Sequence, residues 1–174
     1  MKNLKDSYEP SEPYVIKSGK REGKVLELMM FNNYSFLRWQ LGKIRREYNG
    51  GRKNQYHKHL EWLLQRGENR EAKIICPVCG EDKVSHFSVR FSRGTRRFSI
   101  SPRYTCCEKK ECREMLRAGA FGDNLQFFKP KFSNVTRITK YKIEQKRITE
   151  LYKQIFDLST KRLTRKAAFE FFNE

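Results

Sequence analysis

The chain has 174 residues, enough for one domain or one domain with a small satellite, yet only 37% of them are hydrophobic and 33% are charged. Lysine and arginine outnumber aspartate and glutamate by 38 to 20, so the net charge is +18. This excess favours a polyanionic partner, of which nucleic acid is the commonest. No apolar segment is long enough for a transmembrane helix, and the basic residues are not confined to one amphipathic helix, so the composition argues against a membrane partner.

The first segment, residues 1–21, carries Pro10 and Pro13 among polar neighbours, which predicts a flexible N-terminal arm. Its opening residues lack the apolar run of a signal peptide, so we expect a cytoplasmic or otherwise intracellular, reducing location. Cysteines in such a compartment bind metal more often than they form disulfides. The chain has 5 cysteines, and this odd number fits four ligands and one spare.

Residues 22–72 are predicted to form a helical hairpin. The apolar run over 25–31 is too short to be assigned to a helix or a strand from its spacing alone. Over 34–48, apolar residues recur at helical spacing and predict the first helix, with Gly50 and Gly51 at its end. The residues of this stripe are Leu37, Leu41, Ile44 and Tyr48.

The second helix of this hairpin is predicted over 54–66, with Gly67 as its end. His57 and His59 lie on this helix without an Asn or Asp-His partner at nuclease-like spacing, so they are expected at the surface. The chain also lacks a phosphate-binding loop and a glycine-rich dinucleotide signature. These observations favour a protein that is not an enzyme.

Residues 73–117 are predicted to form a zinc-binding module. Cys76 and Cys79 flank two residues in the run Cys-Pro-Val-Cys-Gly, and 27 residues further on Cys107 begins a second pair that ends, after four residues, at Cys112. Zinc takes four soft ligands at tetrahedral corners, and pairs at these spacings are typical of structural sites. Four thiolates leave no open coordination position, so we expect one structural Zn²⁺ and no catalytic metal.

Cys106 competes with Cys107 for one ligand position. The pair Cys106–Cys112 has five residues between its members, which is wider than usual and favours Cys107. If inward and outward side chains alternate along the second strand from Ile100 onward, Cys106 points inward, unless Pro102 interrupts the alternation. The residues alone leave both choices open.

The residues between the two cysteine pairs predict a two-stranded hairpin with one apolar and one polar face. Phe87, Val89 and Phe91 alternate with polar residues in the first strand, and Phe98 and Ile100 do so in the second. Between Val84 and Thr105 there is no acidic residue, and the arginines there are predicted to contact nucleic acid. They are Arg90, Arg93, Arg96, Arg97 and Arg103.

The run Cys76-Pro77-Val78-Cys79, the hairpin with Arg and Ser, and the run Tyr104-Thr105-Cys106-Cys107 before Cys112 resemble the Ogr/Delta-type zinc finger of phage late-transcription activators. In that family a tyrosine stands three residues before a ligand cysteine that pairs with another after four residues, a match that selects Cys107. The resemblance covers about 40 of the 174 residues. It implies a nucleic-acid context and a phage or mobile-element origin, and it does not fix the activity.

Residues 118–174 are predicted to be an aromatic linker followed by basic helices. The phenylalanines between 121 and 132 indicate an irregular segment or an edge strand, and they suit either the core or stacking on unpaired bases. A long helix is predicted over 135–158 and a short one from Thr164. From residue 129 onward there are 12 basic and 5 acidic residues, so this part also carries positive charge.

The sequence as a whole predicts an α+β fold in which a small zinc-bound β-hairpin, a zinc ribbon or a treble clef, is flanked by an N-terminal helical hairpin and C-terminal basic helices. The function that it favours is a zinc-containing protein that binds DNA or RNA, such as a transcription regulator. Two alternatives are a structural subunit of a larger protein or nucleoprotein complex, and a diverged nuclease. DNA binding at moderate salt separates the first two, and metal-dependent cleavage identifies the third.

Overall fold

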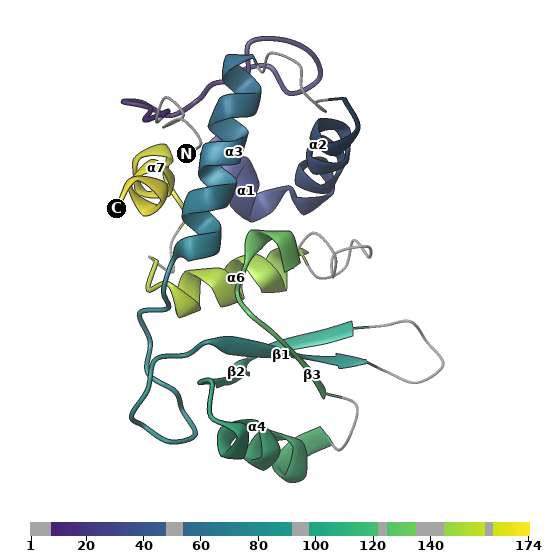
Figure 1. The fold of residues 1–174 in the computed structure, drawn as a ribbon, viewed down its shortest axis with the longest axis vertical. Helices are drawn as coiled ribbons and strands as arrows, with labels where there is room; N and C mark the ends of the chain where they lie inside the picture. The colour runs from purple at the N-terminus through teal and green to yellow at the C-terminus, as the bar shows by residue number, and fades with distance from the viewer. Residues whose placement is uncertain (1–7, 48–53, 92–97, 122–124, 135–144, 159–161) are drawn as a thin grey trace, which may run out of the picture.

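The structure is a computed structural model that describes residues 8–47, 54–91, 98–121, 125–134, 145–158 and 162–174 (Figure 1). It contains helices and an antiparallel sheet, so the predicted α+β class is confirmed. In the described ranges, no helix is long and apolar enough to cross a bilayer. The helices are α1 (Leu26–Asn32), α2 (Tyr34–Glu47), α3 (Gln55–Asn69), α4 (Lys110–Leu116), the π-helical turn η1 (Arg117–Phe121), α6 (Gln145–Ile155) and α7 (Arg165–Asn173).

Side chains at their N-termini set the starts of two helices. The Asn54 side chain accepts a hydrogen bond from the His57 backbone N–H at 3.0 Å, and Thr164 caps α7 in the same way through Ala167. The short apolar run after Val25 forms α1, which the spacing alone could not assign. Of the predicted helix over 135–158, residues 135–144 lie outside the described part of the chain.

The sheet has three strands in the order β2-β1-β3, with β1 (His86–Phe91) in the centre, β2 (Phe98–Cys106) on one side and β3 (Leu125–Phe128) on the other. Both pairings are antiparallel, so the predicted hairpin is present and gains an edge strand from the phenylalanine-rich segment. The β1–β2 register shifts between Phe87 and Val89, which marks a bulge.

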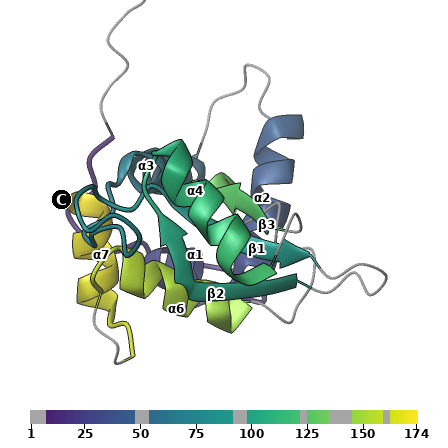
Figure 2. The same ribbon diagram turned by 90° about the horizontal axis from the view of Figure 1, so that it is seen from below.

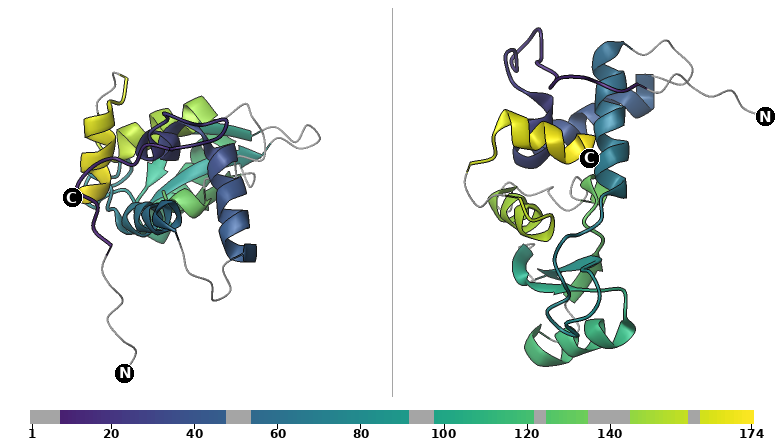
Figure 3. Two further views of the ribbon diagram at one scale, coloured as in Figure 1. Left: turned by 90° about the horizontal axis from the view of Figure 1, so that it is seen from above. Right: turned by 90° about the vertical axis from the view of Figure 1, so that its left-hand side faces the viewer.

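The sheet lies between two helices. Seen from the side, α1, α2, α3 and α7 occupy one end of the molecule, followed by α6, the sheet and then α4 (Figure 3). Viewed from below, α4 lies across the sheet (Figure 2). The Phe87 ring meets Tyr152 of α6 on one face, whereas His86 and Ser88 on the other face are also buried. The predicted polar face is therefore not solvent-exposed at these two positions, because α4 covers it.

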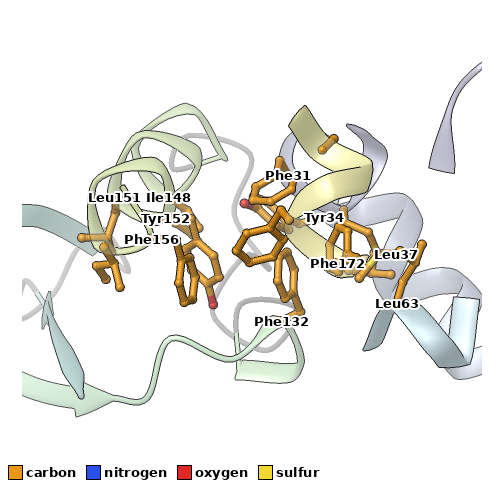
Figure 4. Packing of buried hydrophobic residues seen from close by; sticks show 14 of the residues in the cluster. Phe31, Tyr34, Leu37, Leu63, Phe132, Ile148, Leu151, Tyr152, Phe156 and Phe172 are labelled. Atoms are coloured by element: carbon orange, nitrogen blue, oxygen red, sulfur yellow. The ribbon is translucent and has the colours of Figure 1, made fainter. Parts of the chain in front are cut away.

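Aromatic rings fill the core between α6 and the other helices (Figure 4). The Phe132 ring lies at its centre, with ring centroids 5.1 Å from Tyr152, 5.5 Å from Phe31 and 5.6 Å from Phe172. Of the two roles open to the phenylalanines of this segment, Phe132 therefore serves the core.

The prediction that Gly67 ends α3 is wrong, because the helix continues to Asn69. Gly67 is buried, and a Cβ atom there would lie only 2.5 Å from Cδ2 of Phe132 and 3.2 Å from Cε1 of Phe172. The glycine therefore allows close approach of two aromatic rings to the helix backbone.

Candidate metal centre

A tight loop presents the first two cysteines. The Cys76 N–H donates to the Asp82 carbonyl at 2.7 Å, and the Gly80 N–H donates to the Cys76 carbonyl at 2.9 Å. Gly80 has a φ of +72°, a left-handed conformation that favours glycine and lets the chain turn directly after Cys79. The local sequence Cys-Pro-Val-Cys-Gly thus accounts for the turn that places both sulfurs on the same side.

The other two cysteines come from the junction between β2 and α4. Cys107 follows the last residue of β2, and Cys112 lies in the first turn of α4. The strand pairing with β1 fixes one side of this junction, since His86 lies opposite Cys106. The sulfurs that are distant in sequence are therefore brought together by the sheet.

Four sulfur atoms, those of Cys76, Cys79, Cys107 and Cys112, all lie within 4.8 Å of one another. The Cys79 and Cys107 sulfurs are 3.8 Å apart, and those of Cys107 and Cys112 are 3.5 Å apart. Ligands at about 2.3 Å from a tetrahedral zinc ion would be separated by about 3.8 Å. All five cysteines are free, so these contacts are not disulfides. The arrangement is a candidate metal site.

Hydrogen bonding and burial act in opposite directions on these thiols. Backbone N–H groups of Asp82 and Glu81 lower the pKa of Cys79 to about 6. Burial raises the pKa of Cys107 and of Cys112. Cys79 therefore ionises more readily at neutral pH than Cys107 or Cys112, and a cation among the sulfurs would favour ionisation of these two thiols.

Cys106 lies next to this group but not in it. Its side chain is fully buried, and burial raises its pKa to about 12. The thiol therefore stays protonated at neutral pH in the absence of a metal. The geometry brings Cys107 to the other three cysteines, as spacing favours, and leaves Cys106 to pack beside them.

A lysine joins the two halves of the centre. The Lys109 ammonium, just before α4, lies 2.6 Å from a carboxylate oxygen of Glu81 and 3.1 Å from one of Asp82. The backbone N–H groups of the same two acidic residues lower the pKa of Cys79. Lys109 thus ties the loop that carries the first cysteine pair to the helix that carries the last cysteine.

Few of the predicted nucleic-acid contacts can be placed. Arg90 is exposed on β1. Arg93, Arg96 and Arg97 lie outside the described residues, and Arg103 belongs to β2, although its side chain is not described.

A second basic surface, which sequence reasoning missed, lies along α4 and the start of η1. Lys110, Arg113 and Arg117 are spaced for one helix face and border an open groove of about 600 Å³ with Phe127 of β3. The Arg117 guanidinium carbon is 5.3 Å from the centroid of the Phe127 ring. None of the described residues that line the groove is acidic. The spacing of the three cations in the sequence was the signal that could have revealed this surface.

The prediction that His57 and His59 are surface residues is wrong, since both are buried. The Nε2 atom of His59 is 2.6 Å from a carboxylate oxygen of Glu27, and its Nδ1 atom is 2.9 Å from the Tyr8 hydroxyl. Glu27 also accepts from the Tyr14 backbone N–H at 3.1 Å. This chain of contacts holds residues 8–16 against α1 and α3. His59 lies on the apolar stripe of α3, and that position was a usable signal.

No known family model matches the chain, and neither curated proteins nor solved structures give a match.

Proposed function

We propose that the chain is a zinc-containing protein that binds nucleic acid, such as a regulator of transcription in a phage or mobile element. The resemblance of its cysteine module supports the nucleic-acid context and the origin. The candidate metal is one structural Zn²⁺. Four thiolates would fill a tetrahedral coordination sphere, so no position would remain for substrate or water. Intracellular zinc sites of this ligand type hold small modules together.

The order of elements supports the treble clef over the zinc ribbon. One cysteine pair lies on a loop, a β-hairpin follows, and the second pair lies at the start of a helix. In a zinc ribbon both pairs would lie on hairpin loops. The helix α4 is thereby held in a fixed position relative to the sheet.

The observation that carries the proposal is the groove beside this centre, lined by Lys110, Arg113 and Arg117 and by no acidic residue among those described. Cations spaced along one helix face suit a row of phosphates. Exposed Arg90 on β1 would add to the positive charge on this side of the sheet. The net charge of +18 gives the whole chain a long-range attraction to a polyanion.

The metal is tested by elemental analysis of the purified protein and two neighbouring variants. We expect one zinc per chain, its loss in Cys107→Ser, and its retention in Cys106→Ser, because only the Cys107 sulfur belongs to the four-sulfur group. Absence of zinc from gently purified protein would refute the metal. If zinc is lost in Cys106→Ser but kept in Cys107→Ser, Cys106 is the ligand and Cys107 is not.

Nucleic-acid binding is tested by measuring affinity for duplex DNA at several salt concentrations. Release of counterions predicts that log K falls with log salt by about 0.9 per phosphate contact. Replacing Arg90 and Arg97 with alanine should weaken binding more than replacing Lys142 and Lys146, with zinc content unchanged. A slope of log K against log salt near zero would favour the alternative function, a structural subunit that docks onto protein in a larger complex.

A further inference from the structure

A groove on the far side of the molecule from the cysteines combines an exposed aromatic ring with positive charge. It lies between the arm that follows Tyr14, one face of α2 and the start of α3, and its volume is about 730 Å³. Figure 1 shows the arm passing across the end of the molecule where α2 ends and α3 begins. None of its lining residues belongs to the metal centre.

The α2 wall of the groove carries two aromatic rings. Phe36, Trp39 and Lys43 are three and four positions apart, so they share one face of the helix. The Phe36 and Trp39 ring centroids are 6.4 Å apart. Trp39 is 55% exposed, whereas Trp62, the second of the 2 tryptophans, is 7% exposed and belongs to the core. A large ring left in water beside a groove is a feature of binding surfaces.

Positive charge surrounds these rings from two walls. Lys17, Lys20 and Arg21 come from the arm and Lys43 from α2, and the described lining contains no acidic residue. The Arg21 guanidinium carbon is 5.5 Å from the Phe36 ring centroid, and the Lys43 ammonium is 5.6 Å from that of Trp39. These cation–π contacts hold the charges next to the aromatic surface.

The local character of this charge is clear from the neighbouring groove. That groove, of about 660 Å³, lies on the other side of the arm and is lined by Glu9, Glu12 and Glu22. Three carboxylates therefore line that groove, whereas Lys20, Arg21 and Lys43 line only the Trp39 groove, and Lys17 borders both. A negatively charged ligand would be directed to the Trp39 side.

The groove also offers a polar group. Tyr56 belongs to its lining, and the hydroxyl of this residue is buried with no hydrogen-bond partner among the described residues. A buried hydroxyl without a partner is unfavourable, and a ligand in the groove could supply the missing acceptor.

We infer that this groove binds a single strand of nucleic acid, with an unpaired base stacked on Trp39 and the adjoining phosphates beside Lys17, Lys20, Arg21 and Lys43. Aromatic platforms flanked by cations are how proteins hold unpaired strands, because every base has a face that can stack. A duplex keeps its bases stacked on each other and would leave Trp39 unused. Cations on two opposite walls fit a strand that runs along the groove better than a single nucleotide.

This inference rests on the proposed function only in taking nucleic acid as the partner, and its site gives its own signal. Titration of the zinc-loaded protein with a twelve-residue oligothymidylate should quench tryptophan fluorescence, and the change should vanish in Trp39→Phe, which keeps Trp62. In an anisotropy assay, Trp39→Ala should bind the strand roughly 5- to 150-fold more weakly, the range for loss of one stacked base.

The charges are tested with matched pairs of lysines. Lys17→Ala with Lys20→Ala should reduce the salt slope for the single strand by about 1.4, at about 0.7 per phosphate. Lys146→Ala with Lys166→Ala removes the same charge from exposed positions on α6 and α7 and should leave the slope unchanged.

Several outcomes would overturn the inference. If the strand binds while Trp39 fluorescence and the affinity of Trp39→Ala stay unchanged, the groove is not the site, although the proposed function stands. The same quenching by thymidine monophosphate or by polyglutamate would assign the groove to a nucleotide or an acidic peptide. If the strand quenches Trp39 while Arg90→Ala with Arg97→Ala leaves duplex binding intact, the groove stands and the proposed hairpin surface fails.

Discussion

Aromatic rings fill the interior at the end of the molecule that holds α1, α3 and α7, whereas at the α4 end the buried side chains are mainly cysteines. Each buried phenylalanine or leucine contributes about 1.5–3 kcal/mol to folding, so the first end is stabilised by apolar burial. At the second end the apolar residues packed against the cysteines, such as Val78, Leu116 and Phe127, are only partly buried. Apolar burial thus stabilises the first end, whereas the second would depend more on a metal held by its four cysteines.

Metal removal should separate the two regions most clearly. A chelator should abolish hydrogen-exchange protection in the loop over 74–84 and in α4, while α3 and α7 keep theirs. The reason is that structural zinc supplies about 10–16 kcal/mol in small zinc modules, which the few apolar contacts at this end could not replace. Unchanged protection of α4 after complete removal of the metal would contradict the comparison, and so would uniform loss throughout the chain.

Truncation of the central ring should have the converse effect. Phe132→Ala should lower the free energy of unfolding by about 3–5 kcal/mol, because it leaves a cavity among Phe31, Tyr152 and Phe172. Denaturant unfolding of the zinc-loaded protein measures this change, and the zinc content should not fall. Phe127→Ala, beside the cysteines, is the control and should cost less, because that ring is only partly buried.

Replacement of two glycines in the helical region with alanine should change the stability of the protein in opposite directions. Gly67→Ala should destabilise by about 1–3 kcal/mol, since its new methyl group meets a buried ring that cannot move aside. Gly42→Ala, on α2 with nothing within 4 Å, should stabilise by up to about 1 kcal/mol through helix propensity. Thermal unfolding of both variants tests this, and equal shifts would show that packing at Gly67 is looser than described.

The smallest expected effect concerns an ion pair of Arg70, which lies directly after α3 where the chain leads toward the cysteine loop. The Arg70 guanidinium lies 2.6 Å from Glu174 and holds the pKa of that carboxyl below its usual range. Because the folded pKa is depressed, the pair stabilises the fold above about pH 4.3 and loses its effect as pH falls through the folded pKa. Glu174→Gln should therefore cost at most about 1 kcal/mol at pH 7 and nothing at pH 2, as measured by urea unfolding. A cost that persists at pH 2 would point to packing.

The sequence was most informative where the relevant contacts are local. The turn after Cys79 depends on Gly80, and the helix starts at Asn54 and Thr164 depend on side chains three residues from their partners. Such features follow from spacing and residue type. Spacing also favoured Cys107 over Cys106 without deciding between them, and the four-sulfur group contains Cys107.

Contacts between distant parts of the chain could not be anticipated in the same way. Glu27 meets His59 across 32 positions, and Gly67 lies against Phe132, so neither role is visible in the neighbouring residues. From the sequence alone, a glycine that allows an aromatic ring to approach the helix backbone cannot be distinguished from a glycine that ends a helix. The face of β1 that carries Ser88 reads as solvent-exposed until α4 covers it.

The aromatic core draws on both flanks of the cysteine module, since Phe31 and Leu63 precede it along the chain and Phe132 and Phe172 follow it. During synthesis, α1 and α3 would therefore leave the ribosome well before α7, the helix that completes their packing. The four cysteines lie close together in sequence, so with a bound metal the loop and helix that carry them could become ordered before α7 is made, although Phe87 of β1 also packs on Tyr152 of the later helix α6. If zinc reaches the nascent chain, the first part of the protein to become ordered would then be the cysteine module in the middle of the sequence.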